Sequence, residues 1–312
     1  MKRSNEEGQL KKVVKKFSIS DIENLTGIKA HTIRVWEQRY DFFTTKRTET
    51  NIRYYDDADL CLFLNIATLN ENGYKISKIS KMDIDEINNL VKRLKEDHYN
   101  VNVQVQMLSN AMLKMDDDEF DEILDGCIND MGVETSMADI IFPFLRKVGF
   151  MWQVGSINPA HEHFATHKIE QKLIQQTYLH KKQTKHCGKK YLLFLPPNET
   201  HEVGLLFAQY LLKANGHQTL YLGQNLPFES ISEVNTYYEP DFAFSVLTIS
   251  NSDNNIDETV QKLRENLGNT PLILAGNQVS YNNIYPQENL ILIKNIGEFT
   301  QITEKLAMSI AS

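Results

Sequence analysis

From Lys190 onward, short apolar segments alternate with stretches of helical periodicity, and this alternation constrains the fold more than any other feature of the chain. Each apolar segment has the length of one strand, and the helical stretches between them are long enough to serve as crossover connections. The pattern predicts a doubly wound parallel sheet, which binds its ligands at the carboxyl ends of its strands. The predicted strands cover residues 191–195, 219–222, 242–249, 272–274 and 290–293.

Several chemically distinctive residues fall at these predicted strand ends. The run Glu199-Thr200-His201-Glu202-Val203-Gly204 directly follows the first strand. A neutral imidazole that binds a metal needs a partner for its second nitrogen, and Glu199 is placed to be that partner of His201. Gly204 allows close approach of the backbone. The segment 221–227 occupies the equivalent place after the second strand, where ligand contact and a helix cap remain alternatives.

The run from Glu199 to Gly204 resembles the Asp/Glu-x-His-x-x-Gly signature of cobalamin-binding domains. This resemblance implies that His201 displaces the benzimidazole of the cofactor and is the metal ligand that binds cobalt from below. It also implies that the displaced tail enters a pocket bordered by Ser245, Leu247 and Gly276. Ala275 stands where the family usually has glycine, which adds a methyl group beside that tail.

A second signature lies before the predicted sheet. Trp152, nine intervening residues and the pair Glu162-His163 resemble the Trp-x9-Glu-His signature of cobalamin-dependent photoreceptor regulators. Tryptophan offers a flat apolar face, so the resemblance implies a cap over the upper face of the corrin, with burial of Trp152 in a core as the alternative. Photosensing members can bring a histidine to cobalt from beside this Trp. Here Gln153 occupies that place, and the candidate substitutes are His161 and His167.

The N-terminal part differs in charge from the rest of the chain. Residues 1–80 contain 14 Lys and Arg against 11 Asp and Glu, a net charge of +3, whereas the whole chain has −8 and the remainder therefore −11. Only the N-terminal part is therefore predicted to face phosphate groups.

This N-terminal part has the pattern of a winged helix-turn-helix. Residues 20–23 (Ser-Asp-Ile-Glu) are predicted to form a capping box, 26–28 a tight turn, 30–40 the second helix and 44–54 the wing, with Asn51 at its turn. We expect Trp36 and Tyr40 in the core between helix and wing.

Residues 17–82 resemble the DNA-binding domain of MerR-type regulators, including the pattern Thr-Ile-Arg-x-Trp-Glu-x-Arg-Tyr from Thr32. The resemblance implies that the second helix enters the major groove and that the wing holds the backbone. For Glu37 and Arg39, a solvated helix face is the alternative. The implied DNA-binding residues are His31, Thr32, Arg34, Arg39, Lys46, Arg47, Arg53 and Tyr54.

The predicted fold class is multidomain α plus α/β. We expect a disordered tail over 1–16, the winged helix-turn-helix over 17–95, a four-helix bundle cap over 96–182, a linker over 183–189 and a Rossmann- or flavodoxin-like doubly wound domain over 190–312. A further helix is predicted over 83–93 and a connector over 96–105. The predicted bundle helices cover 103–114, 118–130, 134–149 and 159–182.

Composition places the chain among cytoplasmic proteins. Its three cysteines have neither disulfide-framework nor zinc-ligand spacing, and its longest apolar segments are too short to span a membrane. We therefore expect reduced thiols and no membrane partner.

Taken together, the motifs from Phe17 to the C-terminus resemble the CarH/LitR-like family of cobalamin-dependent photoreceptors. This resemblance implies a transcriptional regulator without enzymatic activity, with repression as the expected direction. Adenosylcobalamin is the favoured cofactor, and double-stranded operator DNA and a homo-oligomer, dimer or tetramer, are the expected partners. In this family, light cleaves the cobalt–carbon bond and the assembly breaks.

Two other functions are retained. One is a MerR-type regulator whose sensory domain no longer binds cobalamin and answers to another ligand or a partner protein, for which Ala275 is the main support. The other is a corrinoid-dependent methyl transfer protein. It is less favoured because no stretch of this chain is left to form domains for the methyl donor and acceptor.

Overall fold

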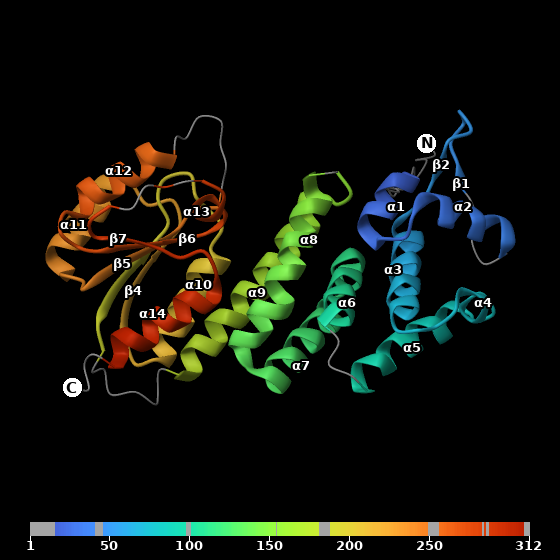
Figure 1. Cartoon of the computed structure of the whole chain (residues 1–312), viewed down its shortest axis with the longest axis horizontal. Helices are drawn as coiled ribbons and strands as arrows, with labels where there is room; N and C mark the ends of the chain where they lie inside the picture. Colours follow the sequence, from blue (N-terminus) through green and yellow to red (C-terminus); the bar gives the residue numbers. More distant parts are fainter. Residues whose placement is uncertain are drawn as a thin grey trace, which may run out of the picture. The chain divides into compact units, whose positions relative to one another are not determined.

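The computed structural model describes residues 16–40, 46–97, 101–153, 155–180, 188–248, 256–282, 284 and 287–308 (Figure 1). The chain divides into two compact units, 1–165 and 166–312. The predicted tail lies outside the described residues except for Lys16, and so does the predicted linker up to residue 187. The same holds for residues 44 and 45 of the wing, 249 of the third strand and 181–182 of the last bundle helix.

The first unit begins with the predicted winged helix-turn-helix. Its elements are α1 (Ile19–Thr26), α2 (Ala30–Arg39), the antiparallel wing strands β1 (Lys46–Arg47) and β2 (Arg53–Tyr54), α3 (Asp57–Glu71), α4 (Ile76–Ile79) and α5 (Ile84–Asp97). Gly27 ends α1 in a left-handed conformation with φ 74°, and Asn51 has φ 63° at the predicted turn of the wing. Trp36 is buried and Tyr40 half-buried, so the expected core residues point inward. The remaining core of this domain contains Phe17, Ile22, Ile33, Leu60 and Phe63.

The predicted capping box over residues 20–23 is wrong. The residue before α1 is Ser18, whose Oγ accepts a hydrogen bond from the Asp21 backbone at 3.2 Å, while Asp21 accepts from the Ser18 backbone at 2.7 Å. The helix must start this early because Ile22 and Leu25 both face the core. Glu23 instead serves the next helix: it accepts from the Ala30 backbone at 3.0 Å, since Lys29 provides no side-chain cap.

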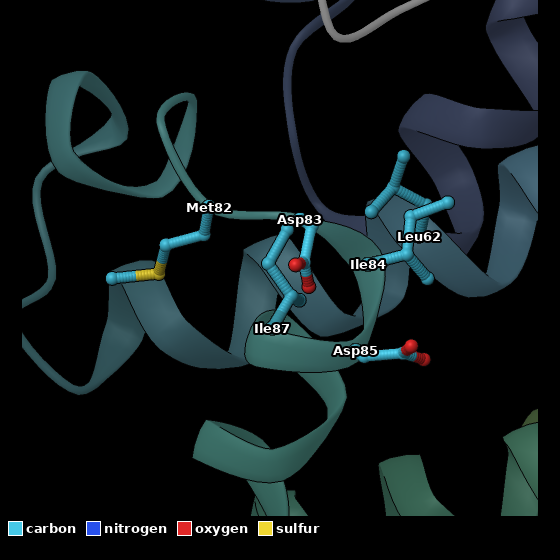
Figure 2. A pocket seen from close by; sticks show the side chains of 6 residues that line it. All are labelled: Leu62, Met82, Asp83, Ile84, Asp85 and Ile87. Atoms are coloured by element: carbon cyan, nitrogen blue, oxygen red, sulfur yellow. The ribbon is translucent and has the colours of Figure 1, made fainter.

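A hollow lined by apolar and acidic side chains lies beside α5. Figure 2 shows its lining: Leu62 comes from α3, and the others come from the segment that opens α5, namely Met82, Asp83, Ile84, Asp85 and Ile87. Ile84 is largely exposed there, while Ile87 is buried. The hollow therefore belongs to the winged helix-turn-helix and contains none of the predicted site residues.

The bundle follows with little connecting chain. Its helices are α6 (Val101–Lys114), α7 (Asp117–Thr135), α8 (Phe142–Gln153) and α9 (Pro159–His180), with a π-helix, η1 (Ser136–Ile141), between α7 and α8. The predicted connector over 96–105 is wrong, because α5 continues to Asp97 and α6 begins at Val101, where Val103 and Gln104 are already buried. The predicted helix break between residues 130 and 134 is confirmed by Gly132, which has φ 80°. Phe164 of α9 packs edge-on against Phe120 of α7.

The second unit contains the predicted parallel sheet. Its strands are β3 (Lys190–Phe194), β4 (Gln218–Gly223), β5 (Phe242–Val246), β6 (Leu272–Ala275) and β7 (Leu290–Leu292), and all of their pairings are parallel. The third strand is shorter than predicted, since Leu247 and Thr248 follow it without strand structure. The helices of this unit, besides part of α9, are α10 (Val203–Ala214), α11 (Phe228–Tyr238), α12 (Ile256–Leu267), α13 (Asn277–Tyr281) and α14 (Ile296–Met308).

Helices cover both faces of this sheet, as the alternation of apolar and helical segments predicts. On one face, Leu192 and Phe194 of β3 share a buried cluster with Ile231 of α11 and Val260 of α12. On the other, α10 contacts β3 and β5, and Phe299 of α14 packs against a ring of β5 (Figure 1). The doubly wound fold is thus present.

The strand order defines where a ligand is bound. The order is β4-β3-β5-β6-β7, so the chain moves outward from β3 to β4 and then returns to build the other half from β5. In doubly wound sheets the crevice at such a reversal, beyond the carboxyl ends of the strands, is the ligand site. The loops that follow β3 and β5 therefore form the expected site.

Among the described residues, no helix is both long and apolar enough to cross a membrane.

Candidate functional site

Glu199 lies in the loop after β3 and is almost completely buried, with 4% of its surface exposed. Its Oε1 accepts hydrogen bonds from the backbones of Thr200 and His201, each at 3.1 Å, and lies 2.8 Å from Nδ1 of His201. Its Oε2 accepts from the backbone N–H of Thr248, just beyond β5, at 2.6 Å. This carboxylate therefore ties the two loops together at the reversal of strand order.

The orientation of the His201 ring follows from this carboxylate. Because an ionised carboxylate can only accept, the Nδ1 atom carries the proton, and in a neutral ring the lone pair then resides on Nε2. The side chain is 53% exposed although its partner is buried. A half-exposed imidazole with a fixed Nδ1–H is the arrangement in which proteins present Nε2 to a metal.

The loop after β4 braces the same site. The backbone N–H of Asn225 donates to the carbonyl of Glu199 at 3.1 Å, and its Oδ1 accepts from the backbone of Asn198 at 2.9 Å. Asn225 has φ 54°, a conformation that asparagine tolerates better than most residues. Ligand contact and helix capping are the two alternatives for the segment 221–227. The contacts of Asn225 add a third role, which is support of the loop that carries His201.

A second brace went unrecognised in the sequence. The hydroxyl of Tyr221, on the edge strand β4, donates to Oε1 of Glu202 at 2.9 Å, beside His201. Burial, together with this bond and the charge of Glu202, raises the pKa of Tyr221. Only the parallel pairing of β3 with β4 brings these residues together, so no local motif signals it.

We predict that Tyr221→Phe lowers the free energy of unfolding by about 1 kcal/mol, the typical net contribution of one intramolecular hydrogen bond. Tyr191→Phe is the matched control, because the Tyr191 hydroxyl is buried without a hydrogen-bond partner in the described structure. Removing that hydroxyl should leave stability unchanged or raise it. Urea unfolding of the two variants measures the difference, and equal losses would show that the Tyr221–Glu202 bond does not stabilise the loop.

The residues predicted to border the cofactor tail meet at the ends of β5 and β6. Ser245 is fully buried, and its Oγ has no hydrogen-bond partner among the described residues. The backbone N–H of Leu247 donates to the carbonyl of Ala275 at 2.9 Å. Gly276 has φ 108°, and a Cβ there would clash with the carbonyl oxygen of Leu247. A Cβ on Gly204 would make only ordinary contact with Val246.

Ala275 itself ends β6 and is half-buried, with its Cα opposite Val246 of β5. The close approach of backbones at this point is therefore made by the next residue, Gly276, and not by Ala275.

The residues of the predicted upper cap lie in the first unit, whereas those around His201 lie in the second. Trp152, at the end of α8, is 57% exposed, which excludes its alternative role as a core residue within this unit. Glu162 and His163 are in the first turns of α9, and their side chains approach to 3.2 Å. The substitutes for Gln153 are both engaged: Nδ1 of His161 accepts from the Asn158 backbone at 3.4 Å, and Nδ1 of His167 lies 3.0 Å from Glu170.

The predicted DNA-binding residues of α2 are mostly on its surface. His31, Arg34 and Arg39 are exposed, while Thr32 is half-buried with its Oγ1 at 3.3 Å from the imidazole of His31. On the wing, exposed Arg47 donates to the backbone and side-chain oxygens of Asn51, both at 3.0 Å, and so fixes the turn.

Other charged residues of this domain hold its framework together. Glu37 is not solvated: its side chain is buried, accepts from the Tyr55 hydroxyl at 2.7 Å and lies 3.2 Å from Nε of Arg53. Lys46 is bound by two carboxylates at the start of α3, Asp56 at 2.5 Å and Asp59 at 2.7 Å. The charge of Lys46 is thus compensated within the domain. Tyr54 is half-buried, with Lys16 over its ring.

Two segments of the chain match known families. Residues 17–83 match the MerR HTH family of regulatory proteins, which covers α1 to α4 and the wing. Residues 104–175 match the B12 binding domain family, which covers most of the bundle including Trp152, Glu162 and His163.

Similar proteins extend over most of the chain. The HTH-type transcriptional repressor CarH of Myxococcus xanthus is 24% identical over 257 residues, which cover 80% of this chain and 85% of that protein. The repressor CarA of the same organism is 28% identical over 228 residues, 72% of this chain and 73% of that protein. Among solved structures, the monomethylamine corrinoid protein of Methanosarcina barkeri aligns with 64% of this chain and 95% of its own at a TM-score of 0.49 and 15% identity.

The winged helix-turn-helix, the matched bundle and the doubly wound sheet together define a MerR-type DNA-binding regulator with a cobalamin-binding domain. Over most of its length the chain is similar to the repressors CarH and CarA, which supports a CarH-like regulator.

Proposed function

We propose that this regulator is a repressor whose assembly and operator binding are controlled by adenosylcobalamin, with His201 as the protein ligand to cobalt. The observation that carries the proposal is the buried Glu199 carboxylate, which holds Nδ1 of His201 at the reversal of strand order. Its four hydrogen bonds make the loop rigid, and a rigid loop presents Nε2 without a further ordering cost.

The residues present fit the cofactor. The buried Ser245 hydroxyl, without a hydrogen-bond partner in the described structure, would gain one from a polar group of the cofactor tail. Trp152, Glu162 and His163 would cover the upper face. When bound, adenosylcobalamin supplies a cobalt–carbon bond that light can break.

Control of assembly then follows from linkage. A cofactor that binds only the assembly-competent state stabilises that state in proportion to the logarithm of its concentration over its Kd. The proposed assembly is a homo-oligomer, dimer or tetramer, within the cytoplasm, and loss of the adenosyl group in light removes the stabilisation. In this proposal the chain acts by binding and performs no catalysis.

The ion pairs of the predicted DNA-binding residues decide which of them we propose to contact DNA. Arg34 and Arg39 on α2, with His31 and Thr32, face the major groove, and Arg47 with Tyr54 of the wing faces the backbone. Arg53 contributes less to phosphate binding, because the buried Glu37 carboxylate lies 3.2 Å from its Nε. Lys46 makes little contribution to phosphate binding, because Asp56 and Asp59 already compensate its charge.

Arg34→Ala is expected to weaken operator binding and to reduce the slope of log K against log salt by about one, the effect of one lost phosphate contact. Lys46→Met is the comparison variant. It should leave the slope unchanged and lower only the stability of the domain, since its partners lie within the domain. Fluorescence anisotropy of labelled operator at several salt concentrations measures the slope for both variants. An equal change of slope would place Lys46 at the DNA as well.

The proposed function is tested by size-exclusion chromatography with full absorption spectra, on protein incubated with adenosylcobalamin in darkness and then illuminated. A coloured oligomer that binds operator DNA and becomes smaller in light supports the proposal. A colourless protein whose size ignores cofactor and light would favour the alternative, a MerR-type regulator that answers to another ligand or a partner protein. Ala275→Gly distinguishes the cause, because restored colour would trace the defect to the extra methyl group.

A further inference from the structure

A network of five polar side chains runs through the interior of the first unit and joins four helices. Nζ of Lys147 on α8 donates to Oε1 of Gln106 at 2.9 Å, and Nε2 of Gln106 donates to Oδ1 of Asn110 at 3.3 Å, both on α6. Nδ2 of Asn110 donates to Oδ1 of Asn65 on α3 at 2.6 Å. Nδ2 of Asn65 in turn donates to Oδ1 of Asn88 on α5 at 2.7 Å. The network thus leads from the bundle into the DNA-binding domain.

Most members of this network are buried among apolar side chains. Asn65, Gln106 and Asn110 are buried, and the surrounding faces of α3 and α6 consist largely of residues such as Leu64, Met107 and Ala111. Apolar faces alone allow two helices to shift along each other, because dispersion and hydrophobic contacts are not directional. Each buried amide, in contrast, finds a donor and an acceptor in only one alignment, and any other leaves it unsatisfied.

The bundle end of the network is Lys147, near the carboxylate of Glu71 at the end of α3. Burial lowers the pKa of Lys147 to about 8, and the charge of Glu71 acts in the opposite direction. An ammonium that is poorly solvated depends on its hydrogen-bond partners, so the bond from Lys147 to Gln106 holds α8 against α6. Trp152, the proposed cap of the cofactor, lies later on the same helix α8.

We propose that this polar network fixes the DNA-binding domain on the bundle in one alignment and transmits the effect of the cofactor from α8 to the DNA-binding helices. A displacement of α8 must either carry α6 and α3 with it or leave buried amides without partners. Leaving buried amides without partners is costly, so the bundle and the DNA-binding domain move together. This inference rests on the cobalamin-dependent regulation proposed above, but the mechanical link itself can be tested without cofactor.

The chain offers a matched pair of variants on α6. Gln104 and Gln106 are 5% and 6% exposed. Among the described residues, the side chain of Gln104 accepts a hydrogen bond from Cys127 of α7, within the bundle, whereas Gln106 joins the network. Gln106→Met and Gln104→Met therefore remove the same amide from equally buried positions. A second network variant, Asn65→Leu with Asn110→Leu, removes both partners of the contact between α3 and α6 and replaces them by apolar groups of similar size.

The first measurement is hydrogen exchange of the full chain without cofactor. The amides of α3 and α5 are expected to exchange about tenfold faster in the double variant than in Gln104→Met, because the double variant removes the bond between α3 and α6 and the DNA-binding domain then opens separately from the bundle. Equal exchange in all variants would contradict the mechanical link, whatever the cofactor does.

The second measurement is the ratio of operator affinities with and without adenosylcobalamin in darkness. We expect this ratio to fall at least about fivefold in the network variants and to stay unchanged in Gln104→Met, while the affinity for the cofactor is retained. A wild-type ratio of one would show that the proposed function has failed, and the exchange data would still judge the link. A normal ratio in the network variants would overturn the proposed transmission.

Discussion

Gly276→Ala is expected to abolish cobalamin binding and to lower the free energy of unfolding of the sheet domain by about 3 kcal/mol or more. Two effects add at this position. The backbone has φ 108°, which side chains with a Cβ rarely adopt, and the new methyl group would clash with the carbonyl of Leu247 and lie 2.9 Å from its carbonyl carbon. The loops at the ends of β5 and β6 would have to separate where the cofactor tail is expected.

Gly216→Ala is the control for this prediction. Gly216 also has a positive φ, 81°, but a Cβ there would have no atom within 4 Å, so only the conformational part of the cost applies. We expect a loss of about 1 kcal/mol with unchanged cofactor binding. Thermal unfolding and spectroscopic titration with cobalamin measure both quantities. Similar behaviour of the two variants would show that the approach of Gly276 to Leu247 is unimportant.

Glu199→Ala is expected to weaken cobalamin binding by roughly 10- to 100-fold, the effect that loss of a residue supporting a metal-bound histidine commonly has. The carboxylate bonds Nδ1 of His201 and three backbone N–H groups, and through Thr248 it connects the loops after β3 and β5. Its removal frees the ring to rotate and leaves buried donors unsatisfied, which should also cost about 3 kcal/mol of stability.

Two further variants identify the cause. Glu199→Gln keeps one carbonyl oxygen for the contacts of Oε1, but its NH2 group cannot accept from the Thr248 backbone, so it should lose only part of the stability that Glu199→Ala loses. It should also lower affinity, because a neutral amide does less to raise the basicity of the imidazole. Glu202→Ala removes the neighbouring carboxylate, which accepts from Tyr221 and does not touch His201 in the described contacts, so its affinity should change less. If Glu199→Ala and Glu202→Ala lose affinity equally, the role assigned to Glu199 is incorrect.

The fold was predictable where local patterns suffice. Apolar segments of strand length recur from Tyr191 onward, and the parallel sheet follows from their alternation with helices. Glu199 and His201 are two residues apart in one loop, so their contact could be predicted from spacing alone. Trp152 and Glu162 were recognised in the same way, through a fixed interval.

The remaining site residues depend on contacts between distant segments. Asn225 and Thr248 reach Glu199 because β4 and β5 both pair with β3. The sequence of a single strand does not predict which strands will be its neighbours. The cap of α1 was misplaced for a related reason: Ser18 and Ser20 both suit a cap, and the burial of Ile22 decides between them. Glu37 likewise resembles a surface residue until β2 brings Arg53 beside it.

The most direct test of the account is whether His201 binds cobalt. Protein grown with ¹⁵N-labelled histidine is loaded with adenosylcobalamin, converted to the Co(II) form and examined by electron paramagnetic resonance, beside unlabelled protein and His201→Ala. We predict that labelling changes the axial nitrogen splitting from triplets to doublets in the wild type, and that this doublet is absent from His201→Ala. Triplets that persist with labelled histidine would show that the benzimidazole still binds cobalt, and would contradict the proposed role of His201.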